Sequence, residues 1–156
     1  MQNVFFYNYP VGWIGIAETN GAISRVYFRG DKKDFGGFTA AETPLIKEAA
    51  AQLAEYFAGK RFEFDLPLAP VGTEFQRSVW QALQTIPLGE TRSYGEIAAQ
   101  IGNPKACRAV GMANNRNPVV IIIPCHRVIG WNGSLTGYGG GLDVKQFLLN
   151  LERPHH

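Results

Sequence analysis

A thiol, an imidazole and a guanidinium occupy three consecutive positions, Cys125, His126 and Arg127, directly after Pro124. A cysteine reacts as its thiolate, and a nearby imidazole or cation favours that form. Successive side chains of a strand point to opposite sides. His126 therefore reaches Cys125 only if Pro124 turns the chain or a water bridges the two side chains. The cluster predicts a nucleophilic cysteine, and a small buried thiol without chemistry is the alternative.

An imidazole that takes a proton from a thiol needs an acid to orient it. Glu152 is the best candidate among the later carboxylates, because it ends a predicted helix over residues 144–152. The resulting relay of Cys125, His126 and Glu152 would follow the logic of cysteine hydrolases. Burying His126 and Arg127 without partners would be costly, which argues against an inert thiol. The residue types alone leave both interpretations open.

The segment in front of this cluster is strongly apolar. Residues 119–123 are all valine or isoleucine, which predicts a strand in the core. Pro124 ends that strand, because proline cannot donate to a ladder of hydrogen bonds. We therefore expect the thiol to emerge at the bottom of a pocket with rigid walls.

The start of the chain predicts a β-meander. Aromatic and β-branched runs over residues 3–10, 12–19 and 22–28 are separated by Tyr9-Pro10 and Asn20-Gly21. An Asn-Gly pair between two such runs is a strong hairpin signal.

An amphipathic helix is predicted to follow a polar loop over residues 30–42. Thr43 and Pro44 are typical of an N-cap and a first helical residue, and Gly59 is typical of the position after a helix. The apolar stripe consists of Leu45, Ala49, Leu53 and Phe57. Residues 62–66 alternate between apolar and acidic side chains, which predicts a further strand. Residues 67–72 form a predicted linker.

Two capping boxes open helices in the second half of the chain. The first pairs Thr73 with Gln76, and its helix is predicted to bury Phe75, Val79, Leu83 and Trp80. The second pairs Ser93 with Glu96 and opens a short helix that Gly102 ends.

A third helix is predicted over residues 105–114, with Asn103 as its N-cap and Pro104 as its first residue. Two short helices joined by a glycine-containing turn are typical of a helix-turn-helix, although helical hairpins are common. The third helix carries Lys105 and Arg108, and Arg116 lies just beyond its end. It also contains small residues that allow close approach to a partner: Ala106, Ala109, Gly111 and Ala113.

Charge is unevenly distributed along the 156 residues, whose formal net charge is +2. Residues 1–69 hold 7 Lys/Arg against 8 Asp/Glu, whereas residues 70–156 hold 8 against 5. The basic second half favours a polyanionic partner, and a solvated basic face is the alternative.

The composition excludes several classes of protein. No apolar run approaches the roughly 20 residues of a membrane span, and the N-terminus lacks the basic region of a signal peptide. Two cysteines, Cys107 and Cys125, do not make a disulfide framework, so we expect reduced thiols and a cytoplasmic protein, or a nuclear one in a eukaryote. No Cys/His pairs have metal-site spacing, so no metal is predicted.

The stretch Pro124-Cys125-His126-Arg127-Val128, with Asn117 eight positions before the cysteine, resembles the active-site signature of the methylated-DNA–protein-cysteine methyltransferases, the O6-alkylguanine-DNA alkyltransferases. The resemblance covers residues 73–152. Further landmarks of that family occur in order on both sides of this stretch: Ile86-Pro87-x-Gly89, Ser93-Tyr94-x-x-Ile97-Ala98, Gly102-x-Pro104-x-Ala106, Arg108-Ala109-Val110-Gly111-x-Ala113, and Gly137-Tyr138-x-Gly140-Gly141-x-x-x-Lys145-x-x-Leu148-Leu149-x-x-Glu152.

The resemblance implies a fold and a function. The fold is a small ribonuclease-H-like α/β domain, residues 1–68, followed by a winged-helix or helix-turn-helix domain, residues 69–156, that carries the active site. The function is DNA repair: the protein extrudes O6-alkylguanine, with O4-alkylthymine as a second candidate, from duplex DNA and moves the alkyl group irreversibly to Cys125. The resemblance also implies that the protein is a monomer and needs no cofactor.

The same resemblance assigns roles to the catalytic residues. Cys125 is the acceptor thiolate, His126 acts as a base through a water, and Glu152 orients His126. Asn117 ties the turn that holds the site. Tyr94 helps to rotate the target nucleotide or protonates the departing purine.

Roles in binding also follow from the resemblance. Tyr138 hydrogen-bonds the extruded base, Lys145 braces the active-site loop, and the carbonyl groups of Cys125 and Val128 read the guanine amino group. Arg108 fills the gap in the duplex. The remaining residues expected at the DNA are Ser93, Tyr94, Ala106, Ala109, Gly111 and Ala113.

Three departures from the family pattern stand out. Gly139 replaces a serine that several relatives use as a donor to the O6 atom, which leaves only a backbone N–H. Cys107 lies on the helix expected to face DNA. The first domain lacks the Cys/His set that holds zinc in some relatives.

Two other functions compete with alkyl transfer. A sensor of the same fold would bind alkylated bases without reacting, but such relatives replace the acceptor cysteine, and Cys125 is present. A thiol hydrolase using Cys125, His126 and Glu152 would leave the helix-turn-helix and Arg108 unexplained.

Overall fold

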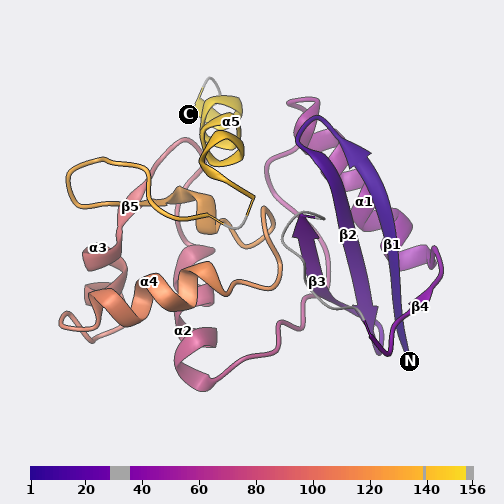
Figure 1. Ribbon diagram of the computed structural model, residues 1–156, viewed down its shortest axis with the longest axis horizontal. Coiled ribbons are helices and arrows are strands. Elements are labelled where there is room, and N and C mark those ends of the chain that lie inside the picture. Colours follow the sequence, from indigo (N-terminus) through magenta and orange to yellow (C-terminus); the bar gives the residue numbers. More distant parts are fainter. Residues whose placement is uncertain (29–35, 139, 154–156) are drawn as a thin grey trace. The chain divides into compact units, whose positions relative to one another are not determined.

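The computed structural model describes residues 1–28, 36–138 and 140–153 (Figure 1). The chain divides into two compact units. The N-terminal unit comprises Met1–Pro70 and Pro118–Ile122, and the C-terminal unit comprises Val71–Asn117 and Ile123–His156. Within the described ranges, no helix is long and apolar enough to cross a membrane.

A four-stranded sheet forms the N-terminal unit together with one helix, α1. The strands are β1 (Gln2–Tyr9), β2 (Gly12–Thr19), β3 (Ala22–Phe28) and β4 (Thr39–Ala40), in the order β3-β2-β1-β4. The first three form the predicted antiparallel meander, and β4 lies parallel to β1. Asn20 and Gly21 both have positive φ at the hairpin turn, as a tight hairpin with right-handed twist requires.

Helix α1 (Pro44–Phe57) begins where the sequence predicts, because Thr43 Oγ1 accepts a hydrogen bond from Ile46 N at 3.2 Å. It packs against the sheet (Figure 1). Leu45 and Phe57 of the predicted stripe are only half-buried. The buried residues of the helix are Ile46, Ala49, Ala50, Gln52, Leu53 and Tyr56.

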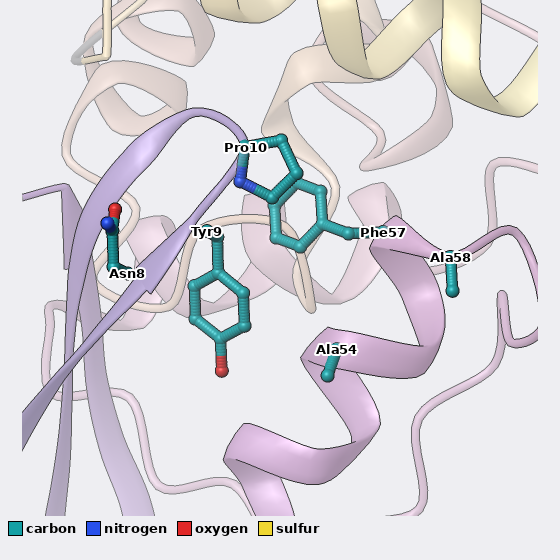
Figure 2. Close-up of a pocket in the computed structure, with 6 residues that line it drawn as sticks. All are labelled: Asn8, Tyr9, Pro10, Ala54, Phe57 and Ala58. Carbon is teal, nitrogen blue, oxygen red and sulfur yellow. The ribbon is translucent and has the colours of Figure 1, made fainter.

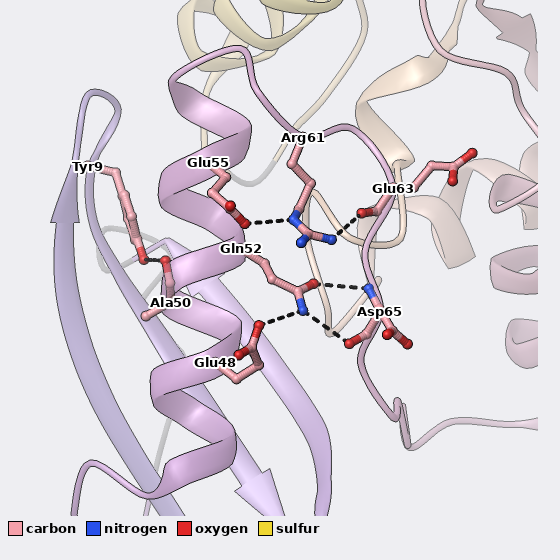
Figure 3. A network of polar contacts seen from close by, with 8 residues as sticks. All are labelled: Tyr9, Glu48, Ala50, Gln52, Glu55, Arg61, Glu63 and Asp65. Atoms are coloured by element: carbon pink, nitrogen blue, oxygen red, sulfur yellow. Dashed lines mark hydrogen bonds and ion pairs between the residues drawn. The ribbon is translucent and has the colours of Figure 1, made fainter.

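The strand predicted over residues 62–66 is wrong. The side chain of Gln52 takes both backbone groups of Asp65: Gln52 Nε2 donates to Asp65 O at 3.1 Å, and Asp65 N donates to Gln52 Oε1 at 3.0 Å (Figure 3). Nearby, Arg61 Nη1 donates to Glu63 O at 3.0 Å. Side chains thus satisfy backbone groups that a strand would pair with another strand.

A shallow pocket lies where β1 meets the end of α1 (Figure 2). It is lined by Asn8, Tyr9, Pro10, Ala54, Phe57 and Ala58. The ring of Tyr9 stacks on Phe57 with centroids 5.2 Å apart, and Tyr9 Oη donates to Ala50 O at 2.9 Å. The lining carries no thiol, imidazole, carboxylate or amine, so we assign this pocket to packing.

The apolar run over residues 119–123 is buried as predicted, but it is not a strand. Only Val119 pairs with another strand, through an isolated bridge to Val26 of β3. Ile121 has φ of 71°, and the N–H of Ile122 bonds to a carbonyl two residues back at 2.8 Å. A β-branched residue at positive φ makes a γ-turn and cannot continue a strand.

The C-terminal unit contains three mutually packed helices, a short parallel sheet and a final helix. Its elements are α2 (Glu74–Leu83), β5 (Arg92–Ser93), α3 (Tyr94–Gln100), α4 (Cys107–Asn115), a 3-10 turn (Cys125–Arg127), β6 (Val128–Ile129) and α5 (Leu142–Glu152). Both predicted capping boxes are present. Trp80 locks α2 to α4, because its Nε1 donates to Ala113 O at 2.9 Å. Phe75, expected to be buried, is half-buried.

The start predicted for the third helix at Asn103 is wrong by a few residues. Asn103 N donates to Ala98 O at 2.9 Å, and Gly102 has φ of 82°, so Asn103 completes the C-terminal cap of α3. Helix α4 begins only at Cys107, and its N-cap Ala106 offers no side-chain acceptor.

Candidate active site

Pro124 turns the chain sharply in front of the thiol. Its φ and ψ are −80° and 65°, and Cys125 N donates to Ile123 O at 2.8 Å, which is an inverse γ-turn. The 3-10 turn Cys125–Arg127 follows, and Cys125 is only 3% exposed. The turn expected from Pro124 is therefore present, although the element in front of it is not a strand.

Glu152 joins the two side chains that follow the thiol. His126 Nε2 lies 2.7 Å from Glu152 Oε2, and Arg127 Nε donates to Glu152 Oε1 at 2.7 Å. Arg127 Nη1 also donates to Ile86 O at 2.8 Å. All three side chains are buried, so the predicted pair of His126 and Glu152 exists, and Arg127 finds its partners in Glu152 and the Ile86 carbonyl.

The state of His126 follows from its surroundings. Burial lowers the pKa of the imidazole, and Arg127 and Lys145 act in the same direction, whereas Glu152 opposes them. A carboxylate can only accept, so Nε2 carries the proton and donates to Glu152. Nδ1 is buried and has no hydrogen-bond partner among the residues described. His126 is thus a neutral imidazole with an unprotonated Nδ1.

Glu152 is held in its ionised form. Burial alone would raise the pKa of its carboxyl group, but His126 and Arg127 outweigh burial and hold the pKa at about 2. Since His126 is neutral in the resting site, we attribute most of this effect to the permanently charged Arg127 and to the two hydrogen bonds. Helix α5 supplies the carboxylate from its last residue.

Lys145, also on α5, is a buried cation beside the nucleophile. Its Nζ donates to Val128 O at 2.7 Å and to Thr136 O at 3.1 Å. Burial lowers the pKa of Lys145, and the charge of Cys125 opposes that shift. The ammonium group therefore both holds the chain after the nucleophile and favours a thiolate at Cys125.

Asn114 in the last turn of α4 and Asn117, just beyond the helix, bind the carbonyl groups on either side of Pro124. Asn117 Nδ2 donates to Ile123 O at 2.7 Å, and Asn114 Nδ2 donates to Cys125 O at 3.3 Å. Both side chains are buried. The sequence predicted a role for Asn117 but none for Asn114, a second asparagine one helical turn earlier.

Tyr94 and Lys145 meet at Thr136, a residue for which the sequence predicted no role. The hydroxyl group of Tyr94 is hydrogen-bonded to Thr136 Oγ1, and the Thr136 carbonyl accepts from Lys145. No motif in the sequence marked Thr136. Tyr138 is half-buried nearby in the chain, and Gly139 lies outside the described residues.

The outer face of α4 presents exposed side chains: Cys107, Arg108, Ala109, Met112 and Asn115. Lys105 and Arg116, just outside the helix, are also exposed. Arg108 and Ala109 are therefore placed as a DNA-facing surface would require.

Ala113, Gly111 and Ser93 differ from expectation. Ala113 is 2% exposed and its carbonyl is bound by Trp80, so it faces the core and the predicted DNA contact is wrong. A Cβ atom at Gly111 would lie 3.7 Å from the ring of Tyr94, so its small size also serves packing of α3 on α4. Ser93 Oγ accepts from Glu96 N as the N-cap of α3, and Ala106 is half-buried.

Across the described ranges, no group of three or more His, Cys, Asp or Glu side chains is arranged to hold a metal ion. The site brings together a shielded thiol, a neutral imidazole, a carboxylate and two cations held by defined partners.

Two domain models match the chain: the ribonuclease-like domain of 6-O-methylguanine DNA methyltransferase over residues 5–70, and its DNA binding domain over residues 74–154. A methylated-DNA–protein-cysteine methyltransferase of Methanosarcina acetivorans is 57% identical over 145 residues, which are 92% of this chain and 93% of that protein. The constitutive one of Bacillus subtilis is 51% identical over 150 residues, 92% and 91% of the two chains.

Solved structures agree with these matches. The crystal structure of Mycobacterium tuberculosis O6-methylguanine methyltransferase has a TM-score of 0.93 at 45% identity and covers 100% of this chain and 95% of that one. That of Mycobacterium tuberculosis OGT in complex with DNA has a TM-score of 0.91 at 47% identity, with coverage of 97% and 93%. The predicted fold class is confirmed, and the chain belongs to the methylated-DNA–protein-cysteine methyltransferase family.

Proposed function

We propose that this protein repairs duplex DNA by moving an alkyl group from O6 of guanine to Sγ of Cys125, once per molecule. One observation carries the proposal: Cys125 sits on a shielded turn whose next residue, His126, is a neutral base held by Glu152. The names of the similar proteins, and a DNA complex of one of them, support the same activity.

The transfer balances without a cofactor. His126 Nδ1 takes the thiol proton through a water, and the thiolate attacks the alkyl carbon. A carbon–sulfur bond forms while the bond between carbon and O6 breaks, and the guanine keeps the electron pair and takes up a proton. Tyr94 is our candidate donor of that proton. A thioether has no easy route back to a thiol, so each molecule reacts once.

The fixed charges support this chemistry. The ammonium group of Lys145 favours the thiolate before attack. The carboxylate of Glu152 stabilises the imidazolium that forms when His126 accepts the proton. Arg127 keeps Glu152 ionised and in place, and it touches neither thiol nor base in this proposal.

The base would enter the site extruded from the helix. Chemistry at a base edge requires the base outside the stack, at a cost of a few kcal/mol. We propose that Tyr138 and the Val128 carbonyl contact the extruded base and that Asn117 holds the turn beneath it. A backbone N–H at Gly139 would replace the serine hydroxyl of relatives, and O4-alkylthymine is a second candidate substrate.

The outer face of α4 is our proposed DNA contact. Arg108 would fill the space the base leaves, while Ala106 and Ala109 allow close approach of the helix to the minor groove. Lys105 and Arg116 would contact phosphates and supply affinity that does not depend on sequence. We further propose a monomer in the cytoplasm, with a domain boundary between residues 68 and 69.

Mass spectrometry of the protein after incubation with a duplex containing one O6-methylguanine tests this function. We expect a single methyl group on the peptide that contains Cys125, saturating at one per protein. An intact complex with DNA but no adduct would favour a sensor, and continued turnover without an adduct would favour a thiol hydrolase. A methyl group on Cys107 would mean that the acceptor is the other thiol.

A further inference from the structure

Thr136 connects the proposed proton donor, Tyr94, to the buried cation Lys145. The Tyr94 hydroxyl is hydrogen-bonded to Thr136 Oγ1, and the Thr136 carbonyl accepts from Lys145 Nζ at 3.1 Å. Lys145 Nζ also donates to Val128 O, and the N–H of Val128 donates to Cys125 O. Hydrogen bonds and short stretches of backbone therefore link the proton donor to the nucleophile turn through Thr136.

The ring and the hydroxyl group of Tyr94 are positioned by different segments. Tyr94 is the first residue of α3, and a Cβ atom at Gly111 of α4 would lie 3.7 Å from its ring. The hydroxyl group points to Thr136 instead. Tyr94 and Thr136 are both half-buried, so a base that enters from solvent can reach the tyrosine hydroxyl. Packing thus places the ring, and Thr136 sets the direction of the hydroxyl.

A hydroxyl group suits this position because it can both accept and donate a hydrogen bond. Before the base enters, Thr136 Oγ1 can accept the proton of Tyr94. When Tyr94 gives that proton to the guanine, negative charge develops on the tyrosine oxygen, and the threonine hydroxyl can turn to donate to it. A carbonyl group in the same place could only accept, and it would therefore oppose the loss of the proton.

We propose that Thr136 is a positioning residue for proton transfer to the leaving guanine: its hydroxyl orients that of Tyr94 and donates to the tyrosine oxygen as the proton departs. The proton moves from Tyr94 Oη to the purine, which keeps the electron pair of the broken bond between carbon and O6. The tyrosinate regains a proton from water after the base has left. This inference rests on the proposed function, because Thr136 acts only through Tyr94.

A double-mutant cycle between Thr136 and Tyr94 tests this role. Thr136→Val removes the hydroxyl at similar volume and keeps the carbonyl that Lys145 binds. Single-turnover transfer from a duplex containing O6-methylguanine should slow about tenfold, as for one hydrogen bond lost in the transition state. Tyr94→Phe should slow transfer about 100-fold. In the Tyr94→Phe background, Thr136→Val should change the rate less than about twofold, because no tyrosine oxygen remains.

Thr136→Ser keeps the hydroxyl and should transfer within about threefold of the wild-type rate. For Thr136→Val the loss should lie in the rate at saturating protein, while the affinity for the duplex stays within about twofold. The matched control is Ser134→Ala, which removes an exposed hydroxyl two residues earlier and should leave both rate and affinity unchanged. If Thr136→Val does not fold, as thermal unfolding would show, Thr136→Ala carries the same expectation.

Equal slowing by Thr136→Val with and without the Tyr94 hydroxyl would overturn the proposal, because Thr136 would then only hold its loop. A wild-type rate in Thr136→Val, or a Thr136→Ser variant as slow as Thr136→Val, would overturn it as well. If Tyr94→Phe transfers at the wild-type rate, the inference fails while the proposed function stands. Absence of the Cys125 adduct in the wild-type protein would instead refute the proposed function itself.

Discussion

The two faces of helix α4 serve opposite needs. Its inner face, formed by Val110, Ala113 and Asn114, is buried and reaches the nucleophile turn Cys125–Arg127. Its outer face, defined above, is exposed and carries Arg108. One element therefore fixes the reactive group on one side and presents a charged surface on the other.

The two faces differ in whether their charged side chains are buried and paired or exposed to solvent. The charged side chains around the nucleophile turn, Arg127, Glu152 and Lys145, are buried and bound to defined partners. Such groups are costly to disturb, because removing one partner leaves a buried charge uncompensated. Arg108 is solvated, so its loss costs little stability. Chemistry at a single atom requires charges that are buried and held by defined partners. A search along DNA requires solvated charges that can contact phosphates at any sequence.

The largest effect is expected from Cys125→Ala. Alkyl transfer should fall below detection, because the acceptor atom is gone, while binding to duplex DNA should stay within about twofold, since surface contacts are untouched. Mass spectrometry and fluorescence anisotropy measure the two properties. Loss of DNA binding would break the division of labour between the two faces.

A large effect on both rate and stability is expected from Glu152→Gln. The variant should transfer alkyl groups about 100-fold more slowly, because His126 loses the carboxylate that supports its cation. It should also lose about 3 kcal/mol or more of unfolding free energy, because Arg127 is left buried without its ion pair. Single-turnover kinetics and urea unfolding provide the measurements. The exposed Glu74→Gln is the control and should cost less than about 1 kcal/mol.

The stability loss should depend on pH with a defined sign. The pKa of Glu152 is lowered in the folded protein to about 2 from an ordinary 4.5. Its stabilising contribution is therefore complete above pH 4.5 and is lost as the pH falls toward 2. The difference between the wild-type protein and Glu152→Gln should shrink over that range. A constant difference would show that Glu152 acts by packing alone.

The pH dependence of the rate sharpens the description of the nucleophile turn. Burial lowers the pKa of His126 below 6.5, so the base stays unprotonated as the pH falls below that value. Transfer should keep its rate at pH 6.5 and decline by up to about tenfold per pH unit only at lower pH. An acid limb centred above pH 6.5 would mean that another group is the base.

A moderate effect confined to duplex DNA is expected from Arg108→Ala. Repair of a duplex should slow about tenfold, because base extrusion loses the side chain that fills the gap. Reaction with free O6-alkylguanine should hardly change, and stability should stay within about 0.5 kcal/mol. Arg116→Ala is a control for charge alone and should weaken DNA binding without a special effect on extrusion. Equal slowing on free base and duplex would contradict the role of Arg108.

The smallest effect concerns the two thiols in the absence of DNA. A bulky maleimide should modify the exposed Cys107 before the buried Cys125. Peptide mass spectrometry at early times gives the order of modification. Faster reaction at Cys125 would show that the nucleophile turn opens readily and would weaken the contrast between the two faces.

Local signals in the sequence determined much of this protein. Capping residues at Thr43, Thr73 and Ser93 mark helix starts because they satisfy backbone donors within one turn of chain. The adjacent Cys125 and His126 pointed to a later carboxylate as a partner, and the structure pairs His126 with Glu152 of the last helix. These predictions succeeded because each depends on contacts within an element or on the chemistry of a few residue types.

Only the tertiary structure decided where backbone groups find partners from distant segments. Residues 62–66 alternate like a strand, yet Gln52 takes the backbone groups that a ladder would need. Residues 119–123 are apolar enough for a strand, but Ile121 at positive φ turns the chain, and residues 118–122 belong to the N-terminal unit.

The same limit applies to the site. Asn114 and Thr136 owe their roles to carbonyl and hydroxyl groups on other segments. No local pattern marks Thr136, and Asn114 is marked only by its place one helical turn before Asn117. The pattern of small residues predicts that Ala113 faces DNA, yet Trp80 donates to its carbonyl inside the core. Hydrogen bonds between segments far apart in the sequence are fixed by packing, and residue spacing along one helix does not reveal them.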